Sequence, residues 1–143
     1  MEKVVNMITV MNQDYLLLTK IREGDYWTLP GGRAKKGESE KVALKREVGE
    51  ELPGITILEL IPYKEFKGIT PHSKVEVTVS TFFADVKGSI VPDAELTGSA
   101  LCLIKALGDL NLTDITKDIL ESLKNDQLLL SNLSKVMDTY RII

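Results

Sequence analysis

Apolar residues recur along the chain with two different periods, which predict a mixture of strands and helices. Apolar and β-branched runs predict strands over residues 4–11, 15–21, 26–29, 55–61 and 75–86. A polar stretch at residues 12–14 separates the first two runs and predicts a β-hairpin there. Helical spacing predicts helices over residues 39–52, after Thr113 and in the C-terminal segment 126–143.

Two of the expected helices begin at a residue that can cap them. Ser39 and Thr113 carry hydroxyl groups that can accept a hydrogen bond from the first helical turn. Glu40 lies in the first turn of the earlier helix, where the helix dipole favours negative charge. Pro53 and Gly54 predict the end of that helix.

The order of these elements predicts the fold class. Strands mixed with two or three helices, without regular βαβ alternation, are typical of the α+β class. We expect a mixed β-sheet sandwiched between α-helices (α/β/α), and a single domain over residues 1–143, a length that suits one hydrophobic core.

Composition and charge exclude several functions. The formal net charge of −3 argues against a stable nucleic-acid complex, which needs a basic face. His72 and Cys102 are the only histidine and cysteine, so a zinc site built from several such ligands is excluded. No apolar run reaches transmembrane length and the N-terminus lacks a signal-peptide pattern, so we expect a cytoplasmic protein without a membrane partner.

The glycine-rich stretch LPGGRAKKGESEK, residues 29–41, departs from a P-loop at one position. A P-loop reads G-x-x-x-x-G-K-[ST], and its lysine reaches the terminal phosphates. Glu38 stands at the lysine position, and a carboxylate repels a phosphate. A phosphate site here therefore needs a positive group between the glutamate and the phosphate.

Three carboxylates of the helix expected over residues 39–52 share one face. Placed at about 100° per residue, Glu47, Glu50 and Glu51 fall within about 100° of arc, beside an apolar stripe that includes Leu44 and Val48. Like charges at this spacing destabilise an isolated helix. A divalent cation such as Mg²⁺, which binds carboxylates together with substrate phosphates, would reverse that effect. Taken alone, the three glutamates also fit a solvated acidic helix face.

The glycine loop and the helix together carry a longer pattern. Gly32, five residues, Glu38, seven residues and then REVGEE (residues 46–51) resembles the Nudix box, G-x5-E-x7-R-E-U-x-E-E-x-G-U, in which U is aliphatic. Every position through Glu51 matches. The end departs from the box, because one residue is inserted and the chain reads Pro53, Gly54 and Ile55. The insertion alters the end of the helix and leaves its carboxylate face unchanged.

The resemblance implies a hydrolase that uses Mg²⁺ or Mn²⁺ to cleave the pyrophosphate linkage of a nucleoside diphosphate joined to a further group. It implies that Glu50 and Glu51 are the principal metal ligands. Glu47 would be a further ligand or the base that activates water, and the carbonyl of Gly31 would be a backbone ligand.

Two more roles follow from the same resemblance. Arg46 and Glu38 would brace the loop against the helix, although Arg46 also suits an ordinary ion pair with Glu50. The family often recruits an acidic ligand beyond the box, for which Glu95 is our candidate and Asp93 the second. A solvated loop acid is the alternative for both.

Four residues outside the acidic cluster are candidates for binding the substrate. Arg33 and Lys35 lie in the glycine loop, where they could meet phosphates or form a solvated basic loop. Trp27 could stack on a base, although core packing is the expected role of a tryptophan here. Asn111 could read a purine edge, with a turn role as the alternative.

The substrate is the least determined feature. The short chain resembles the MutT-like branch, which cleaves nucleoside triphosphates to a monophosphate and pyrophosphate. An ADP-ribose pyrophosphatase is the alternative, because that branch has a proline beyond the box at a spacing that Pro71 approaches. A Nudix-fold module that binds nucleotides without hydrolysis is a third possibility. Such modules usually lose a box glutamate, and this chain keeps them all.

The apolar C-terminal segment 126–143 generates a prediction about assembly. It can pack on its own core or on a partner subunit, and we expect a homodimer. Analytical ultracentrifugation at micromolar concentration measures the mass directly, and a mass of one chain would contradict the prediction.

Overall fold

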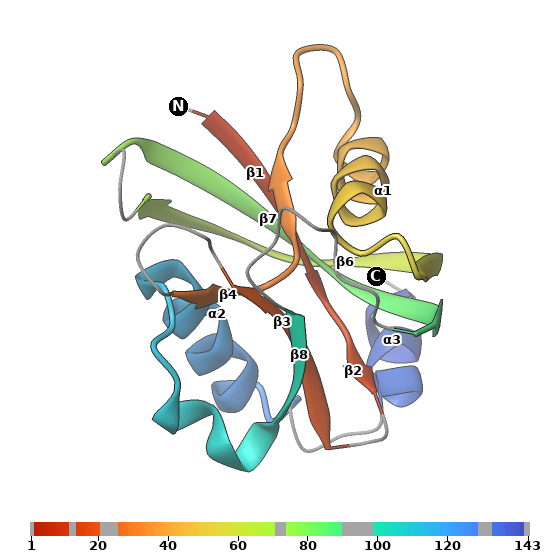
Figure 1. Cartoon of the computed structure of the whole chain (residues 1–143), viewed down its shortest axis with the longest axis vertical. Helices are drawn as coiled ribbons and strands as arrows, with labels where there is room; N and C mark the ends of the chain where they lie inside the picture. The colour runs from red at the N-terminus through yellow and green to blue at the C-terminus, as the bar shows by residue number, and fades with distance from the viewer. Residues whose placement is uncertain are drawn as a thin grey trace.

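Two four-stranded β-sheets form the centre of the protein, with helices packed on both sides (Figure 1). The computed structural model describes residues 2–11, 14–20, 26–70, 74–89, 99–128 and 133–141. The strands are β1 (Glu2–Ile8), β2 (Val10–Met11), β3 (Tyr15–Lys20), β4 (Trp27–Thr28), β5 (Gly31–Arg33), β6 (Ile55–Ile69), β7 (Glu76–Gly88) and β8 (Ser99–Leu103). The helices are α1 (Glu40–Glu51), the 3₁₀ helix η1 (Ile104–Asp109), α2 (Asp114–Asn125) and α3 (Leu133–Arg141).

The first sheet has the order β5-β1-β7-β6 and is mixed. β1 runs parallel to β7 and antiparallel to β5, and β6 pairs antiparallel with β7. In this register Asn6 lies opposite Gly31 on one side and Thr81 on the other. The glycine loop is therefore attached to the sheet through the strand that carries Asn6.

The second sheet is built around β3, which pairs with β2, β4 and β8. The chain passes from the first sheet to the second at Thr9, whose hydroxyl donates a buried 2.8 Å hydrogen bond to the carbonyl of Ala84. The hairpin expected between residues 4–11 and 15–21 is therefore wrong over most of its length. Of the first run only β2 pairs with β3, because the larger part of that run lies between β5 and β7.

Apolar side chains alternate along the strands and form two cores, one on each side. Phe82 packs in the core beneath α1 together with Leu44 and Val48, whereas Phe83 packs in the core beneath α2 and α3. Such alternation is expected when both faces of a sheet are covered. The predicted α+β class and the helix–sheet–helix layering are confirmed, with two sheets in the middle layer.

α1 and α2 begin where the sequence predicts, whereas α3 begins at Leu133, inside the predicted segment 126–143. The Ser39 hydroxyl accepts from the amide of Val42 at 3.2 Å, and the Thr113 hydroxyl accepts from the amide of Thr116 at 3.3 Å. α3 buries Val136 and Met137 in its own chain's core, which is one of the two arrangements left open for the C-terminal segment. None of the described helices is long and apolar enough to cross a bilayer.

Three elements differ from the prediction. β6 continues to Ile69 because Tyr63 and Phe66 extend the apolar face, while bulges near residues 57–59 and 62–65 break the alternation that would indicate a strand. β5 consists of Gly31, Gly32 and Arg33, which have no strand propensity and pair because β1 lies beside them. β8 was missed because a five-residue strand beside a 3₁₀ helix has little pattern of its own.

The packing of α1 generates a stability prediction. Leu44 is fully buried and Val42, two residues before it, is 56% exposed. Leu44→Ala should lower the free energy of unfolding by about 2–5 kcal/mol, because it removes packed atoms and leaves a cavity. Val42→Ala is the matched control and should change it by less than about 0.5 kcal/mol. Chemical denaturation measures both, and equal effects would contradict the observed orientation of α1.

Candidate active site

Two glycines of β5 allow the backbone to approach its neighbours closely. Gly31 has φ +147°, and a Cβ there would lie 1.9 Å from the carbonyl oxygen of Val5. A Cβ on Gly32 would lie 2.4 Å from the carboxyl group of Glu47. A side chain at either position would separate β5 from β1 or displace the glutamate, so the glycines allow the acidic face of α1 to contact the loop.

Arg46 joins the loop to the helix. Its guanidinium donates to both carboxylate oxygens of Glu38, at 2.7 and 3.0 Å, and to the carbonyl of Arg33 at 3.0 Å. The backbone amide of Lys35 donates to Glu38 at 2.8 Å. The Arg46 guanidinium, together with that amide, lowers the pKa of Glu38 to about 2. Glu38 is therefore an ionised structural anchor of the loop at neutral pH.

Glu51 differs from the other box glutamates in its surroundings. It is half-buried and accepts one long hydrogen bond, at 3.4 Å, from the backbone amide of Gly31. Burial, and to a smaller extent the charges of Glu47 and Glu50, raises the pKa of Glu51 to about 8. The ionised form of this carboxyl has too few stabilising contacts in the free protein. A bound cation would stabilise the ionised form.

Glu47 and Glu50 are held by Arg46 to different degrees. Glu47 has a 19% exposed side chain and accepts from Arg46 at 2.9 Å, whereas Glu50 is 62% exposed and lies 3.7 Å from the guanidinium. Within the described part of the chain, no three acidic, histidine or cysteine side chains gather closely enough to hold a metal ion. The oxygen donors suit a hard cation such as Mg²⁺. The side chains of Glu47 and Glu50 would have to turn from Arg46 to join Glu51 around it.

A cavity of about 360 Å³ opens beside Glu51. Five apolar residues, three from the first sheet, one before β5 and one from α2, form much of its wall: Val4, Val77, Val79, Leu29 and Ile115. Polar groups also line it, and these include Asn6, Thr19, Lys20 and Thr28. A mostly apolar pocket with a few polar side chains, next to an acidic cluster, is typical of a small-molecule site.

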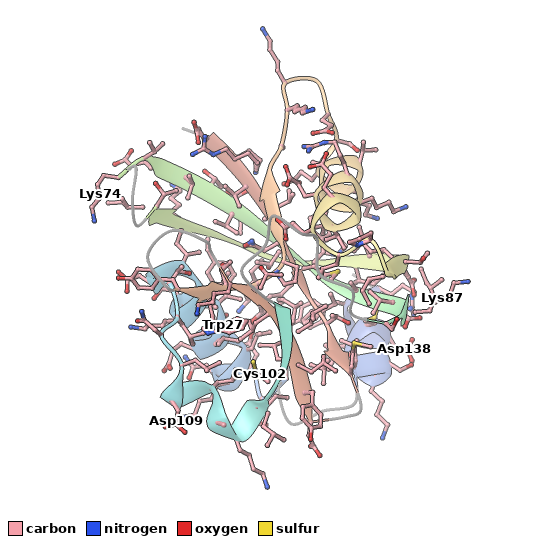
Figure 2. The ribbon with its side chains drawn as sticks, viewed as in Figure 1. Trp27, Lys74, Lys87, Cys102, Asp109 and Asp138 are labelled. Carbon is pink, nitrogen blue, oxygen red and sulfur yellow. The ribbon has the colours of Figure 1, made fainter. Side chains whose placement is uncertain are left out.

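The four predicted substrate-binding residues lie outside the lining of this cavity. Arg33 pairs with Glu2 at 3.0 Å, and Lys35 is exposed in the loop. Trp27 is half-buried against the core beneath α2, apart from α1 (Figure 2), and Lys20 lies 5.9 Å above its ring. Asn111 is exposed, and its carbonyl accepts from the Trp27 amide at 2.8 Å.

Some candidates from the sequence cannot be placed. Glu95 and Asp93 lie outside the described residues, as do His72 and Pro71. Cys102 is half-buried in β8 (Figure 2), and burial raises the pKa of its thiol, which suits a packing role. The loop acid therefore stays a prediction.

The polar residues that line the cavity were missed in the sequence. Asn6 interrupts the apolar run VVNMITV, and an asparagine is unusual in a strand buried on both faces. Because side chains alternate, Val4 and Asn6 face the same side of β1. Lys20 and Thr28 gave no comparable signal, since polar residues are ordinary at the ends of strands.

Comparison with known proteins places this geometry in context. The family model described as the NUDIX domain matches residues 2–123. No curated protein has a sequence that matches the chain. A crystal structure of a MutT NUDIX hydrolase from Burkholderia pseudomallei is 21% identical, with a TM-score of 0.74 over 84% of this chain and 95% of that one. A crystal structure of a MutT protein from Bacillus halodurans is 24% identical, with a TM-score of 0.71 over 85% and 80%.

A third solved structure covers almost the whole chain. The crystal structure of a putative Nudix hydrolase family member from Chromobacterium violaceum is 24% identical, with a TM-score of 0.72. It covers 97% of this chain and 87% of that chain. At these identities the likeness is evidence of a shared fold.

The contacts of Arg46 generate a prediction about the loop. Arg46→Lys keeps the charge but cannot bond Glu38 in two places and reach the Arg33 carbonyl as well. Amide exchange at Lys35 should therefore accelerate roughly tenfold or more, because its acceptor is no longer held. Hydrogen–deuterium exchange measures this. Lys45→Arg, an exposed neighbouring change, is the control, and unchanged exchange in Arg46→Lys would show that the arginine does not hold the loop.

Proposed function

The chain belongs to the Nudix family, and from that premise we propose that it is a metal-dependent pyrophosphohydrolase acting on a nucleoside triphosphate. The products would be a nucleoside monophosphate and pyrophosphate. Family members are generally pyrophosphohydrolases that use a divalent metal. The observation that carries the proposal is the half-buried Glu51 carboxyl, with two further box glutamates on the same helix and a cavity beside it.

The residues that would hold Mg²⁺ or Mn²⁺ are Glu50, Glu51 and Glu47, with the carbonyl of Gly31. Their donor atoms are all oxygens, as these cations prefer. The raised pKa of Glu51 supports a cation nearby, since burial and neighbouring carboxylates oppose its charge in the free protein. When bound, the cation would neutralise phosphate charge and lower the pKa of an attacking water.

The chain's own groups would orient the reaction. Glu47 would serve as a further ligand or accept the proton from the water at a carboxylate oxygen. In the absence of the cation Arg46 donates to Glu47 at 2.9 Å, and this contact would be released when Glu47 turns toward the cation. Glu38 would keep Arg46 in place through its two hydrogen bonds.

The cavity supports a nucleotide as the substrate. Its apolar wall suits the flat face of a base, and with Glu51 at its edge a bound nucleotide would have its phosphates near the proposed metal ligands. The complete set of box glutamates favours hydrolysis over binding alone. ADP-ribose and a non-hydrolysing module are the alternatives that the test must separate.

We expect Glu51→Gln to reduce turnover at least about a hundredfold with the fold intact, because it removes a charged metal ligand and keeps the size. The measurement is a Mg²⁺ panel of common and oxidised nucleoside triphosphates, ADP-ribose and a dinucleoside polyphosphate, with chromatographic identification of products. Mg²⁺ should also raise the thermal midpoint of the wild type, and less so that of the variant.

The matched control is Glu121→Gln, an exposed glutamate of α2 on the opposite side of the protein from α1. Near-normal turnover in Glu51→Gln would refute its role as a ligand. If ADP-ribose is the best substrate, the chain is an ADP-ribose pyrophosphatase and the proposed nucleoside triphosphate substrate is wrong. If nucleotides stabilise the protein but no member of the panel is hydrolysed, the chain is a nucleotide-binding module and the proposed hydrolysis is wrong.

A further inference from the structure

The Asn6 side chain occupies an unusual position in the wall of the cavity. Its residue is 7% exposed, and it lines the cavity from the face of β1 that also carries Val4. The alternate residues Val5 and Met7 pack in the opposite core, beneath α1. Asn6 therefore places an amide in a wall that is otherwise largely apolar.

The buried polar residues fall into two groups, those whose side chains make hydrogen bonds within the described part of the chain and those whose side chains do not. Five of the seven buried polar residues in the described part of the chain make side-chain hydrogen bonds: Thr9, Ser80, Thr81, Thr113 and Thr116. The side chains of the other two, Asn6 and Thr19, make no hydrogen bond to another described residue. Both of these residues line the cavity. The two side chains without a partner among the described residues therefore lie where a ligand would enter.

The Asn6 amide makes no hydrogen bond to another described residue, and its atoms stay accessible from the cavity instead of being sealed in the core. Buried polar groups are normally hydrogen-bonded, and an exception requires a reason. A leucine of similar size would also suit the largely apolar wall, so the packing does not require an amide here. The amide is useful only when an occupant of the cavity supplies a donor and an acceptor.

The chemistry of the amide indicates the kind of occupant. An asparagine presents one acceptor and a two-hydrogen donor side by side. The edge of a nucleobase presents a complementary neighbouring acceptor and donor, and asparagine forms paired bonds with such edges. A sugar or phosphate would leave the apolar wall of Val77, Val79 and Leu29 unused.

We propose that Asn6 is the specificity residue of this chain, whose amide bonds the edge of the substrate's base, with the Thr19 hydroxyl as a second contact. The assignment rests on the proposed function for the identity of the substrate. It differs from the prediction made from sequence, in which Asn111 reads the base. Asn111 lies outside the cavity, so the two assignments can be separated by mutation.

The test measures base preference in two ways. Binding of the four nucleoside monophosphates is measured by calorimetry in metal-free buffer, and kcat/KM of the four triphosphates is measured with Mg²⁺. The wild type should prefer one base, and Asn6→Leu should reduce that preference roughly ten- to a hundredfold. Thr19→Val should have a smaller effect in the same direction. An analogue of the preferred base that lacks its exocyclic group should bind the wild type more weakly than the parent nucleotide does. Asn6→Leu should bind the analogue and the parent nucleotide with equal affinity.

Two further measurements keep a folding defect apart from a loss of recognition. The thermal midpoint of ligand-free Asn6→Leu should stay close to that of the wild type, because the change removes no hydrogen bond to another described residue. Asn6→Ser, which adds no bulk, should also lose base preference. Asn125→Leu at the exposed end of α2 is the matched control for the change in chemistry.

The outcomes separate this inference from the proposed function. If Asn6→Leu hydrolyses triphosphates with unchanged base preference, the assignment is overturned and the proposed hydrolysis is supported. The same conclusion follows if the base preference is lost in Asn111→Leu and kept in Asn6→Leu. Base-selective binding that depends on Asn6, without turnover of any triphosphate, would support the assignment and overturn the proposed hydrolysis. A wild type that binds all four monophosphates equally, or none, would overturn the assignment.

Discussion

The planar guanidinium of Arg46 is the interaction on which the arrangement of the site depends. Its donors reach two carboxylates and one backbone carbonyl, and so connect α1, the glycine loop and the end of β5. A planar fork of donors is needed, because Arg46 makes four hydrogen bonds and an ammonium group carries only three donors. Burial of Leu44 and Val48 sets the rotation of α1, and Arg46 then attaches the loop to its acidic face.

The same region contains groups that are unfavourable for the free protein. Three glutamates share one helical face, and burial raises the pKa of Glu51 to about 8. Asn6 and Thr19 lie nearby without hydrogen-bond partners among the described residues. The other five buried polar residues of the described part of the chain make side-chain hydrogen bonds. Local departures from the rules of stability are expected where a protein binds a ligand, because the ligand completes the interactions.

The proposed chemistry and the proposed base recognition use different parts of the chain. The glutamates and Arg46 come from one continuous stretch, residues 31–51, which is held as a loop and a helix. The cavity wall comes from β1, β3, β7 and α2, which are far apart in sequence. Base preference can therefore change through the strands while the acidic helix stays the same.

The sequence alone determined the features that depend on neighbours along the chain. Helix caps at Ser39 and Thr113, the shared face of the glutamates and the α+β class follow from spacing and periodicity, and the structure confirms the caps and the class. Only the tertiary structure decided that Gly31 and Gly32 form a strand, that Arg33 pairs with Glu2, and that Asn6 faces a cavity. Each of these depends on pairing between segments that are distant in sequence, and burial of a side chain is decided by what the rest of the fold places over it.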